Sequence, residues 1–432
     1  MQRRFEYFIG ICQNENRRNI FYGLKNMKRG VIKVFLFFLC FVNCTGHKNN
    51  DVVDGVIQFD PTREYPLIDL NLSDIADVEF VQLKDRDSAF IFQPYFNHNT
   101  YIGDSCIIVG NYTPSDFSSF GIYRFDRQGN FLNRISGYGR GPGEFASLAK
   151  MSVESDSSIL LFSLFESKIM KVNSKGEILG SWFLPRGHSE VQLLGNSVII
   201  YDRLSIYFNS KGQLVERGAP LKVFDLATSK VSDLLTKECL NNAIQDNAKT
   251  NGHSDPEFIT NYPNLIKTKD GLYLASIQFD TVYFINRNLE VKPKISIDKT
   301  GIPNEYYTLL PVIDMKDYIL LRDVYGGEHR YDKGKRNYYI FLKNENRIYQ
   351  IRNDYIYNNE IEYSSIFFMD KLAFRFLYLS LNCNIFSIYF TYEDIKDCYN
   401  EIPNSIKPLF DTISEDDNPI LAIVKFRESI KN

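Results

Sequence analysis

The chain has 432 residues, of which 44% are hydrophobic and 24% charged, and this ordinary globular composition excludes disordered, collagen-like and coiled-coil chains. The formal net charge is −3, but residues 1–43 hold eight Lys or Arg and two Asp or Glu, which leaves 42 of the 50 bases and 51 of the 53 acids in the remainder. Because that remainder has a net charge of −9, it does not attract phosphate backbones, and nucleic acid is excluded as a partner.

An apolar run at residues 31–42 follows Lys28 and Arg29. Its uncharged part, residues 34–42, would span only about 13 Å as a helix, against about 30 Å for the hydrocarbon core of a membrane. The run is therefore too short for a transmembrane helix and predicts a signal peptide over residues 27–43, with translation starting at Met27. Residues 1–26 are then an over-extended start, the alternative being an unusually long basic region. Either way, residues 1–43 form a leader that the mature protein lacks.

Cys44 follows this run and precedes a polar stretch at residues 45–51. The arrangement resembles the signal of bacterial lipoproteins, in which the cysteine becomes the acylated first residue. Two positions depart from that pattern, because Phe41 stands where it has leucine and Asn43 where it has a small residue. The resemblance implies a lipid anchor at Cys44 in the outer membrane. Because the residues after Cys44 lack an acidic cluster, the periplasmic side is favoured over the cell surface. A plain secretory peptide, or a buried Cys44, stays the alternative.

Residues 44–65 are polar and lack periodicity, so they are expected to form a tether. The later cysteines allow three disulfide pairings, but a chain of this size has a sufficient core without them. Buried free thiols are therefore expected at these positions, which are Cys106, Cys239, Cys383 and Cys398. No cluster of Cys and His has the spacing of a zinc site, and neither a metal nor a cofactor is expected.

One pattern recurs after the tether: a β-rich run, then Asn or Asp, a polar pair, often Gly, and another β-rich run. Asn or Asp can bond its own backbone to start a turn, and Gly supplies a positive φ near the end of the turn. Each copy therefore predicts a β-hairpin. The clearest copies are residues 122–132, 169–179 and 204–215, and copies without the glycine turn at Asp225, Asn286 and Asn344.

So many hairpins must pack against one another in one fold. A lone hairpin is marginal in water, and an open stack exposes edge strands that aggregate. Radial repetition into a propeller solves both problems. The turns at Asp126 and Asn173 lie 47 residues apart, and those at Asn286 and Asn344 lie 58 apart, which suits four-stranded blades. The sequence predicts an all-β fold, a six-bladed β-propeller of four-stranded antiparallel blades over residues 66–428. A pair of β-sandwiches or a barrel is the alternative.

The most specific motif is the run Gly139-Arg-Gly-Pro-Gly-Glu-Phe145, which is too rich in glycine for a helix or strand and predicts a tight loop. This run, after the hairpin at 122–132, resembles bacterial six-bladed β-propeller lipoproteins, whose shape is related to NHL and TolB-like propellers. Residues 278–283 and 417–426 resemble a middle blade and the closing strand of that family. The resemblance covers the chain from about residue 60 to its end and implies the fold, but it assigns no activity.

A propeller must close its ring, and the resemblance implies that one blade takes strands from both ends of the chain. The candidates are residues 78–83 and 420–426, which are expected in the same blade or in adjacent ones. Residues 356–398 diverge from the family, so the blade boundaries there stay open.

No catalytic motif is present: the sequence has no nucleophile elbow, phosphate-binding loop, dinucleotide fingerprint or HExxH pair. Tyr138, Arg140 and Glu144 are the candidate binding residues, because loops at the mouth of a propeller gather ligands. The alternative is that Arg140 and Glu144 bond the backbone of their own loop or each other. Tyr112 and Phe117 offer further stacking surfaces, whereas Asp280 is expected to cap a turn. The five histidines, at positions 47, 98, 188, 253 and 329, show no metal-ligand spacing.

These observations predict a monomeric cell-envelope lipoprotein that acts as a binding or scaffold module for a protein, a peptide or a glycan. Its contact with the membrane is expected through the lipid anchor alone. The alternative is a propeller enzyme, a lyase or hydrolase, with its site at the central channel. Convergence of histidines or carboxylates on that channel would favour the enzyme, and a channel lined by backbone and apolar groups would favour the binding module.

Overall fold

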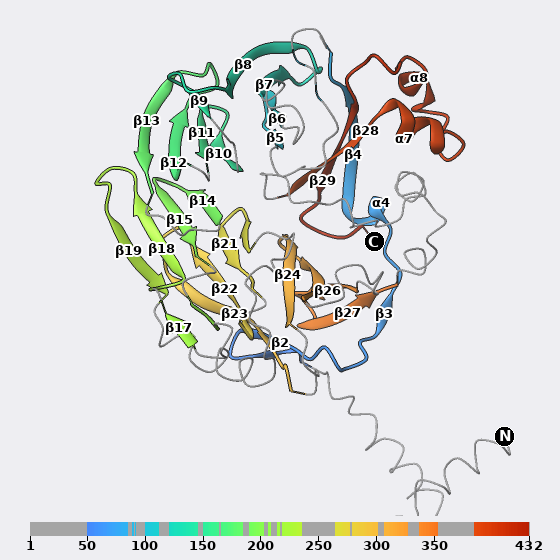
Figure 1. The fold of residues 1–432 in the computed structure, drawn as a ribbon. Coiled ribbons are helices and arrows are strands. Elements are labelled where there is room, and N and C mark those ends of the chain that lie inside the picture. Colours follow the sequence, from blue (N-terminus) through green and yellow to red (C-terminus); the bar gives the residue numbers. More distant parts are fainter. Residues whose placement is uncertain are drawn as a thin grey trace, which may run out of the picture. The chain divides into compact units, whose positions relative to one another are not determined.

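The computed structural model of the chain divides into two compact units, Met1–Asn50 and Asp51–Asn432. The structure describes residues 50–84, 89, 91, 100–111, 121–145, 150–163, 166–184, 190–202, 206–208, 214–216, 218–235, 264–276, 279–300, 306–326, 337–352 and 384–431. The second unit is almost entirely β-structure, and its blades follow one another around a ring as a six-bladed propeller (Figure 1). The predicted fold class is therefore confirmed.

Blades 1 to 3 follow the chain directly. Blade 1 consists of β5 (Thr100–Ile102), β6 (Cys106–Asn111), β7 (Gly121–Asp126), β8 (Phe131–Tyr138) and β9 (Glu144–Phe145). Blade 2 consists of β10 (Lys150–Ser155), β11 (Ser158–Ser163), β12 (Lys168–Val172) and β13 (Ile178–Phe183). Blade 3 consists of β14 (Glu190–Leu194), β15 (Ser197–Tyr201), β18 (Leu221–Asp225) and β19 (Val231–Leu235), with a separate hairpin of β16 (Ile206–Phe208) and β17 (Leu214–Glu216).

Blades 4 and 5 each take strands from the beginning of the unit. Blade 4 consists of β20 (Leu265–Lys267), β21 (Gly271–Leu274), β22 (Thr281–Asn286) and β23 (Val291–Ile297), extended by β2 (Val56–Phe59) and β1 (Val52–Val53). Blade 5 consists of β24 (Tyr306–Asp314), β25 (Tyr318–Gly326), β26 (Tyr338–Leu342) and β27 (Arg347–Ile351), extended by β3 (Leu67–Ile68).

Blade 6 joins the two ends of the propeller. Its described strands are β28 (Ile385–Phe390), β29 (Ile420–Phe426) and β4 (Ala76–Gln82), in that order across the sheet. The strand β29 pairs antiparallel with β4 along its whole length, so the expected closure by residues 78–83 and 420–426 in one blade is confirmed. Three short helices of the described chain accompany this blade: α4 (Leu72–Ile75), α7 (Tyr392–Asp397) and α8 (Lys407–Phe410). No helix among the described residues has the length and hydrophobicity that a membrane span requires.

Residues 52–59 correct the expectation of a tether over 44–65. The strand β2 pairs in parallel with β23, and its alternate residues Ile57 and Phe59 are buried against blades 4 and 5. The carboxylate of Asp51 accepts hydrogen bonds from Arg63 Nη1 at 2.6 Å and from the backbone N–H of Ile348 at 2.8 Å. Five of the eight residues 52–59 are apolar, and the two buried side chains together with the backbone pairing hold the segment on the propeller.

The turns have the expected chemistry. The carboxylate of Asp126 accepts from the backbone N–H groups of Gln128 and Asn130, both at 2.9 Å, and Gly129 has a φ of +79°. The side chains of Asn173 and Asn286 accept two backbone N–H groups each in the same way. Where the pattern lacks glycine, other residues take the positive φ, and these are Ser229, Leu289 and Asn346. The Asn or Asp at the start of the turn therefore determines the hairpin more than the glycine does.

The core consists of clusters of buried apolar side chains, each between two adjacent blades. The described residues form six such clusters, and one of them joins blade 6 to blade 1, where Val81 and Leu421 pack with Ile107 and Val109. Burying one Val, Leu or Ile completely contributes about 1.5–3 kcal/mol. Because every blade packs on two neighbours, this stabilisation continues around the ring.

Candidate functional site

The glycine-rich loop predicted between blades 1 and 2 turns back on itself at the outer edge of blade 1. The strand β9 runs parallel to β8, with Gly137 opposite Glu144 and Tyr138 opposite Phe145. The backbone N–H of Gly139 donates to the carbonyl of Phe145 at 3.1 Å, which closes the base of the loop. The loop therefore places a fifth strand on blade 1.

The side chain of Glu144 supports this loop from inside. Its Oε2 accepts a hydrogen bond from the backbone N–H of Gly141 at 2.8 Å. A Cβ atom on Gly139, whose φ is +156°, would lie 1.9 Å from the same oxygen. Glycine at 139 is therefore favoured by its backbone conformation, and a Cβ there would displace the Glu144 carboxylate. Of the two interpretations of Glu144, the one in which it bonds its own loop matches this geometry.

The other two candidate residues face solvent. Tyr138, the last residue of β8, and Arg140 in the loop are both exposed. A ligand that binds at this loop would therefore meet the phenol ring and the guanidinium group before the carboxylate. Their role in binding stays a prediction.

An apolar surface adjoins the loop on blade 2. Three apolar side chains of its outermost strand β13 are exposed: Ile178, Leu179 and, with 73% of its surface accessible, Phe183. The position that a Cβ on Gly143 would take lies 3.9 Å from Ile178 Cδ1, so Ile178 lies beside the loop. We call Ile178, Leu179 and Phe183 the edge patch. It was missed at the level of sequence, although residues 178–183 are a six-residue strand without a single charge.

A second polar site lies on the inner strands of blades 2, 3 and 4. Side chains on alternate positions of β10 form three layers of contacts across these blades. In the first, Lys150 donates to Glu190 Oε1 at 2.5 Å, and Glu190 Oε2 accepts from the backbone N–H groups of Asn264 and Leu265 at 2.6 and 3.2 Å. Glu190 thereby ties the first residues of β10, β14 and β20 together.

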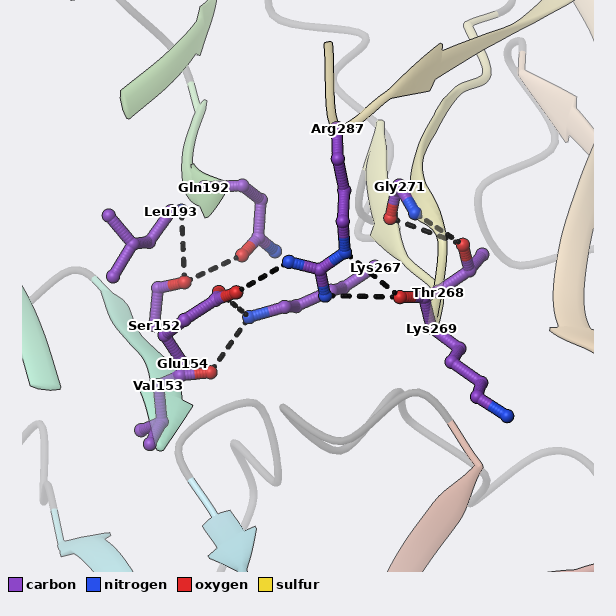
Figure 2. A network of polar contacts seen from close by, with 10 residues as sticks. All are labelled: Ser152, Val153, Glu154, Gln192, Leu193, Lys267, Thr268, Lys269, Gly271 and Arg287. Atoms are coloured by element: carbon purple, nitrogen blue, oxygen red, sulfur yellow. Dashed lines mark hydrogen bonds and ion pairs between the residues drawn. The ribbon is translucent and has the colours of Figure 1, made fainter. Parts of the chain in front are cut away.

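The second and third layers are seen from close by in Figure 2. In the second, Ser152 Oγ donates to Gln192 Oε1 at 3.1 Å. In the third, Lys267 Nζ donates to Glu154 Oε2 and to the carbonyl of Val153, both at 2.8 Å, and Arg287 Nη1 donates to Glu154 Oε1 at 3.0 Å. Glu154 belongs to blade 2 and its two cations to blade 4, so this layer links blades that are not neighbours in the ring.

The electrostatics of the third layer favour the ionised pair. Burial raises the pKa of Glu154, but the charges and hydrogen bonds of Lys267 and Arg287 outweigh burial and leave the pKa below its ordinary value of 4.5. The side chain of Lys267 is only 9% exposed. A carboxylate held by two cations is a poor base and a weak metal ligand, and the geometry supports a structural role for it.

The other residues singled out in the sequence lie partly inside and partly outside the described structure. Asp280 accepts a hydrogen bond from Thr281 Oγ1 at 3.0 Å where β22 begins, as expected of a residue in a turn. Cys106 and Cys398 are buried free thiols, and no metal-binding group of His, Cys, Asp or Glu occurs within the described residues. Outside the described residues lie Cys44, Tyr112, Phe117, Cys239, Cys383 and all five histidines.

The chain is similar to known proteins in its sequence profile and in its fold. The profile of a family described as "Domain of unknown function (DUF4934)" matches residues 56–425. A solved structure described as a "Putative exported protein" from Bacteroides fragilis superposes with a TM-score of 0.55 at 16% identity, covering 86% of this chain and 99% of that one. A member of the DUF4221 family from Bacteroides vulgatus gives a TM-score of 0.40 at 12% identity, covering 82% and 98%. A search of curated proteins finds no match. At such identities the B. fragilis structure shows a shared fold.

Proposed function

The chain belongs to the family described as "Domain of unknown function (DUF4934)", whose profile spans most of the propeller, and from this premise we propose that it is an exported binding or scaffold module of the cell envelope. Its partner is a protein, a peptide or a glycan. The B. fragilis protein of similar fold, which is described as exported, supports this placement.

The edge patch is the observation that carries the proposal. Single apolar side chains on the surface are common. Here an aromatic ring exposed to 73% lies beside exposed aliphatic groups on an edge strand without charges, and such an edge favours aggregation in solution. A partner that covers the patch removes this apolar surface from water. The adjoining loop adds Tyr138 and Arg140, residue types that are enriched where proteins bind one another.

The described part of the inner strands favours a binding module over a lyase or hydrolase. Glu154 and Glu190 are the carboxylates of β10 and β14. Glu154 accepts hydrogen bonds from two cations of blade 4, and Glu190 accepts from Lys150 of blade 2 and from backbone N–H groups at the start of blade 4. Carboxylates engaged in this way serve to hold blades together.

Site-specific photo-crosslinking in cells tests the proposal. A photoreactive phenylalanine analogue is placed at Phe183, and the matched control carries it at Lys269, an exposed position of blade 4 with 79% of its side chain accessible. We expect a discrete covalent adduct from position 183 and none from position 269. Adducts of equal yield from both positions, or from neither, would contradict a specific binding surface.

The lipid anchor is part of the same proposal. Cys44 is its attachment point, and the membrane side it faces is proposed to be periplasmic. We expect the Cys44→Ala variant to move from the membrane fraction to the soluble fraction when cells are lysed and centrifuged, because acylation at that residue alone holds the protein. A variant that stays wholly with the membranes would show that another feature anchors it.

A further inference from the structure

Three blades of this propeller carry a fifth strand outside their outermost strand, and in each case the added strand is parallel. The strand β9 pairs with β8, β2 pairs with β23, and β3 pairs with β27. Two of these strands come from the beginning of the unit and one from a loop, so their origin differs but their place and direction agree. An outer blade edge in this molecule is thus a site that accepts a short parallel strand.

The outer edge of β13 carries no such strand among the described residues. Its backbone is nevertheless oriented for one. Leu184 N–H donates to the carbonyl of Ser167 on the β12 side at 2.8 Å. Because bonded positions alternate in an antiparallel pair, and Trp182 lies opposite Ile169, the N–H and C=O groups of Ser181 and Phe183 point away from β12.

Two of the three added strands bury large apolar side chains. These are Phe145 of β9 and Ile57 and Phe59 of β2, whereas Leu67 of β3 is exposed. β13 itself exposes three large apolar side chains that an added strand would cover, namely Ile178, Leu179 and Phe183. The edge patch also lies beside the loop that carries β9, since a Cβ built on Gly143 would be 3.9 Å from Ile178 Cδ1.

The other outer edges without an added strand provide a contrast. Within the described residues β19 exposes Ser232 and Asp233 together with a single apolar side chain, Val231. β4, which ends the described sheet of blade 6, likewise exposes Asp77 and Glu79 beside Val78. A charged residue on an edge strand is a common protection against pairing. β13 has no such protection.

We propose that β13 binds an extended segment of a partner protein as a fifth, parallel strand of blade 2, with apolar or aromatic side chains at alternate positions of that segment. The proposal rests on the binding function inferred above and names the chemistry of its partner. Backbone hydrogen bonds to Ser181 and Phe183 supply the pairing, and the edge patch selects the side chains.

The test uses the full chain in detergent and a fluorescent peptide with the sequence of residues 54–60, Asp-Gly-Val-Ile-Gln-Phe-Asp, which contains β2. Fluorescence anisotropy measures binding to the parent protein and to Ser181→Pro, which removes an outward N–H but leaves the β12 ladder intact. Ser181→Ala keeps that N–H and is the matched control. Val231→Lys on β19 and Phe183→Lys on β13 each replace an exposed apolar side chain by a positive charge. The two variants compare an edge outside the proposed binding site with the edge inside it.

We expect saturable binding that weakens about tenfold or more in Ser181→Pro and in Phe183→Lys, the ratio that losing one or two hydrogen bonds or an apolar contact produces. Ser181→Ala and Val231→Lys should bind as the parent does, and a peptide with serine in place of its Ile and Phe should not bind. Amide exchange at Ser181 and Phe183 should slow when the peptide is bound. Thermal unfolding followed by circular dichroism confirms that each variant is folded.

Three results would overturn the proposal. The first is binding that Ser181→Pro leaves unchanged, and the second is no saturable binding by the parent protein. The third is a dimer in sedimentation that Ser181→Pro abolishes, because the occupant of the edge would then be a second copy of this chain. If crosslinking from position 183 still finds a partner while the peptide fails, strand addition is wrong and the proposed binding function stands.

Discussion

Val424, in the last strand of the propeller, lies directly opposite Val78 of β4, a residue 346 positions earlier in the chain. Val424 is fully buried against blade 5, whereas Val78 is 37% exposed. The two members of one cross-strand pair therefore differ in environment, although they close the ring together. The same substitution made at each of the two residues therefore separates the effect of burial on stability from that of strand pairing.

We expect Val424→Asp to lower the free energy of unfolding by about 4 kcal/mol, because it places a carboxylate in an apolar cluster without a partner. Val78→Asp, the same substitution across the pair, should cost less than about 1 kcal/mol, since its carboxylate reaches water. Equilibrium unfolding in urea measures both. Equal losses would show that pairing, and not burial, closes the ring.

The layer around Glu154 gives a second prediction. Glu154→Gln leaves Lys267 buried without its counter-charge and should cost up to about 3 kcal/mol of stability. The control is Glu290→Gln, which removes the exposed pair between Glu290 and Lys292 and should leave the urea midpoint close to that of the parent protein. If both substitutions cost the same, the contact between blades 2 and 4 does not contribute to the fold.

The same layer predicts a dependence on acid. The pKa of Glu154 in the folded protein lies below its ordinary value of 4.5. Its contribution to stability is therefore complete above that value and is lost as the pH falls from 4.5 through the folded pKa. Unfolding measured from pH 6 downwards should show a steeper loss in the parent protein than in Glu154→Gln. If the stability of both proteins fell equally with pH, the lowered pKa of Glu154 would be contradicted.

Lys299 should show the opposite trend. Burial lowers its pKa to about 8, although the charge of Asp280 acts in the other direction. Between about pH 8 and 10.5 the unfolded chain binds more protons at this residue than the folded protein does, so stability contributed by Lys299 rises with pH in that window. We expect Lys299→Met to be more stable than the parent at pH 7 and the difference to shrink by pH 10. A constant difference would argue against a lowered pKa at Lys299.

The loop of blade 1 provides the last prediction. Glu144→Ala removes the acceptor of the Gly141 N–H and should cost about 1 kcal/mol, with faster amide exchange at Gly141. Arg140→Ala should leave both stability and exchange unchanged, because that side chain extends into solvent. Loss of exchange protection in the Arg140 variant instead would mean that the arginine organises the loop.

Much of the fold was predictable because its signals are local. Asp126, Asn173 and Asn286 each bond backbone groups two and four residues ahead, so the hairpin is encoded within five residues. The two closing strands were also anticipated, since both are rich in β-branched and apolar residues.

The proposed binding surface was only partly predictable from the sequence. The loop with Tyr138 and Arg140 stands out by composition, but nothing in residues 178–183 distinguishes an open edge from a covered one. Exposure of Phe183 depends on whether another strand pairs with β13. That is a property of neighbours and not of the strand itself.

Turn chemistry and alternation by themselves determined that this protein folds as a series of hairpins, because those interactions join residues a few positions apart. Only the tertiary structure decided which distant segments complete each blade, as when Phe59 pairs with Ile297 and residues expected to be a tether become a strand. The same holds for the meeting of Glu154 with Lys267 and Arg287. Such contacts depend on the closed ring, which brings side chains of separate blades together. No local sequence pattern indicates that they are close in space.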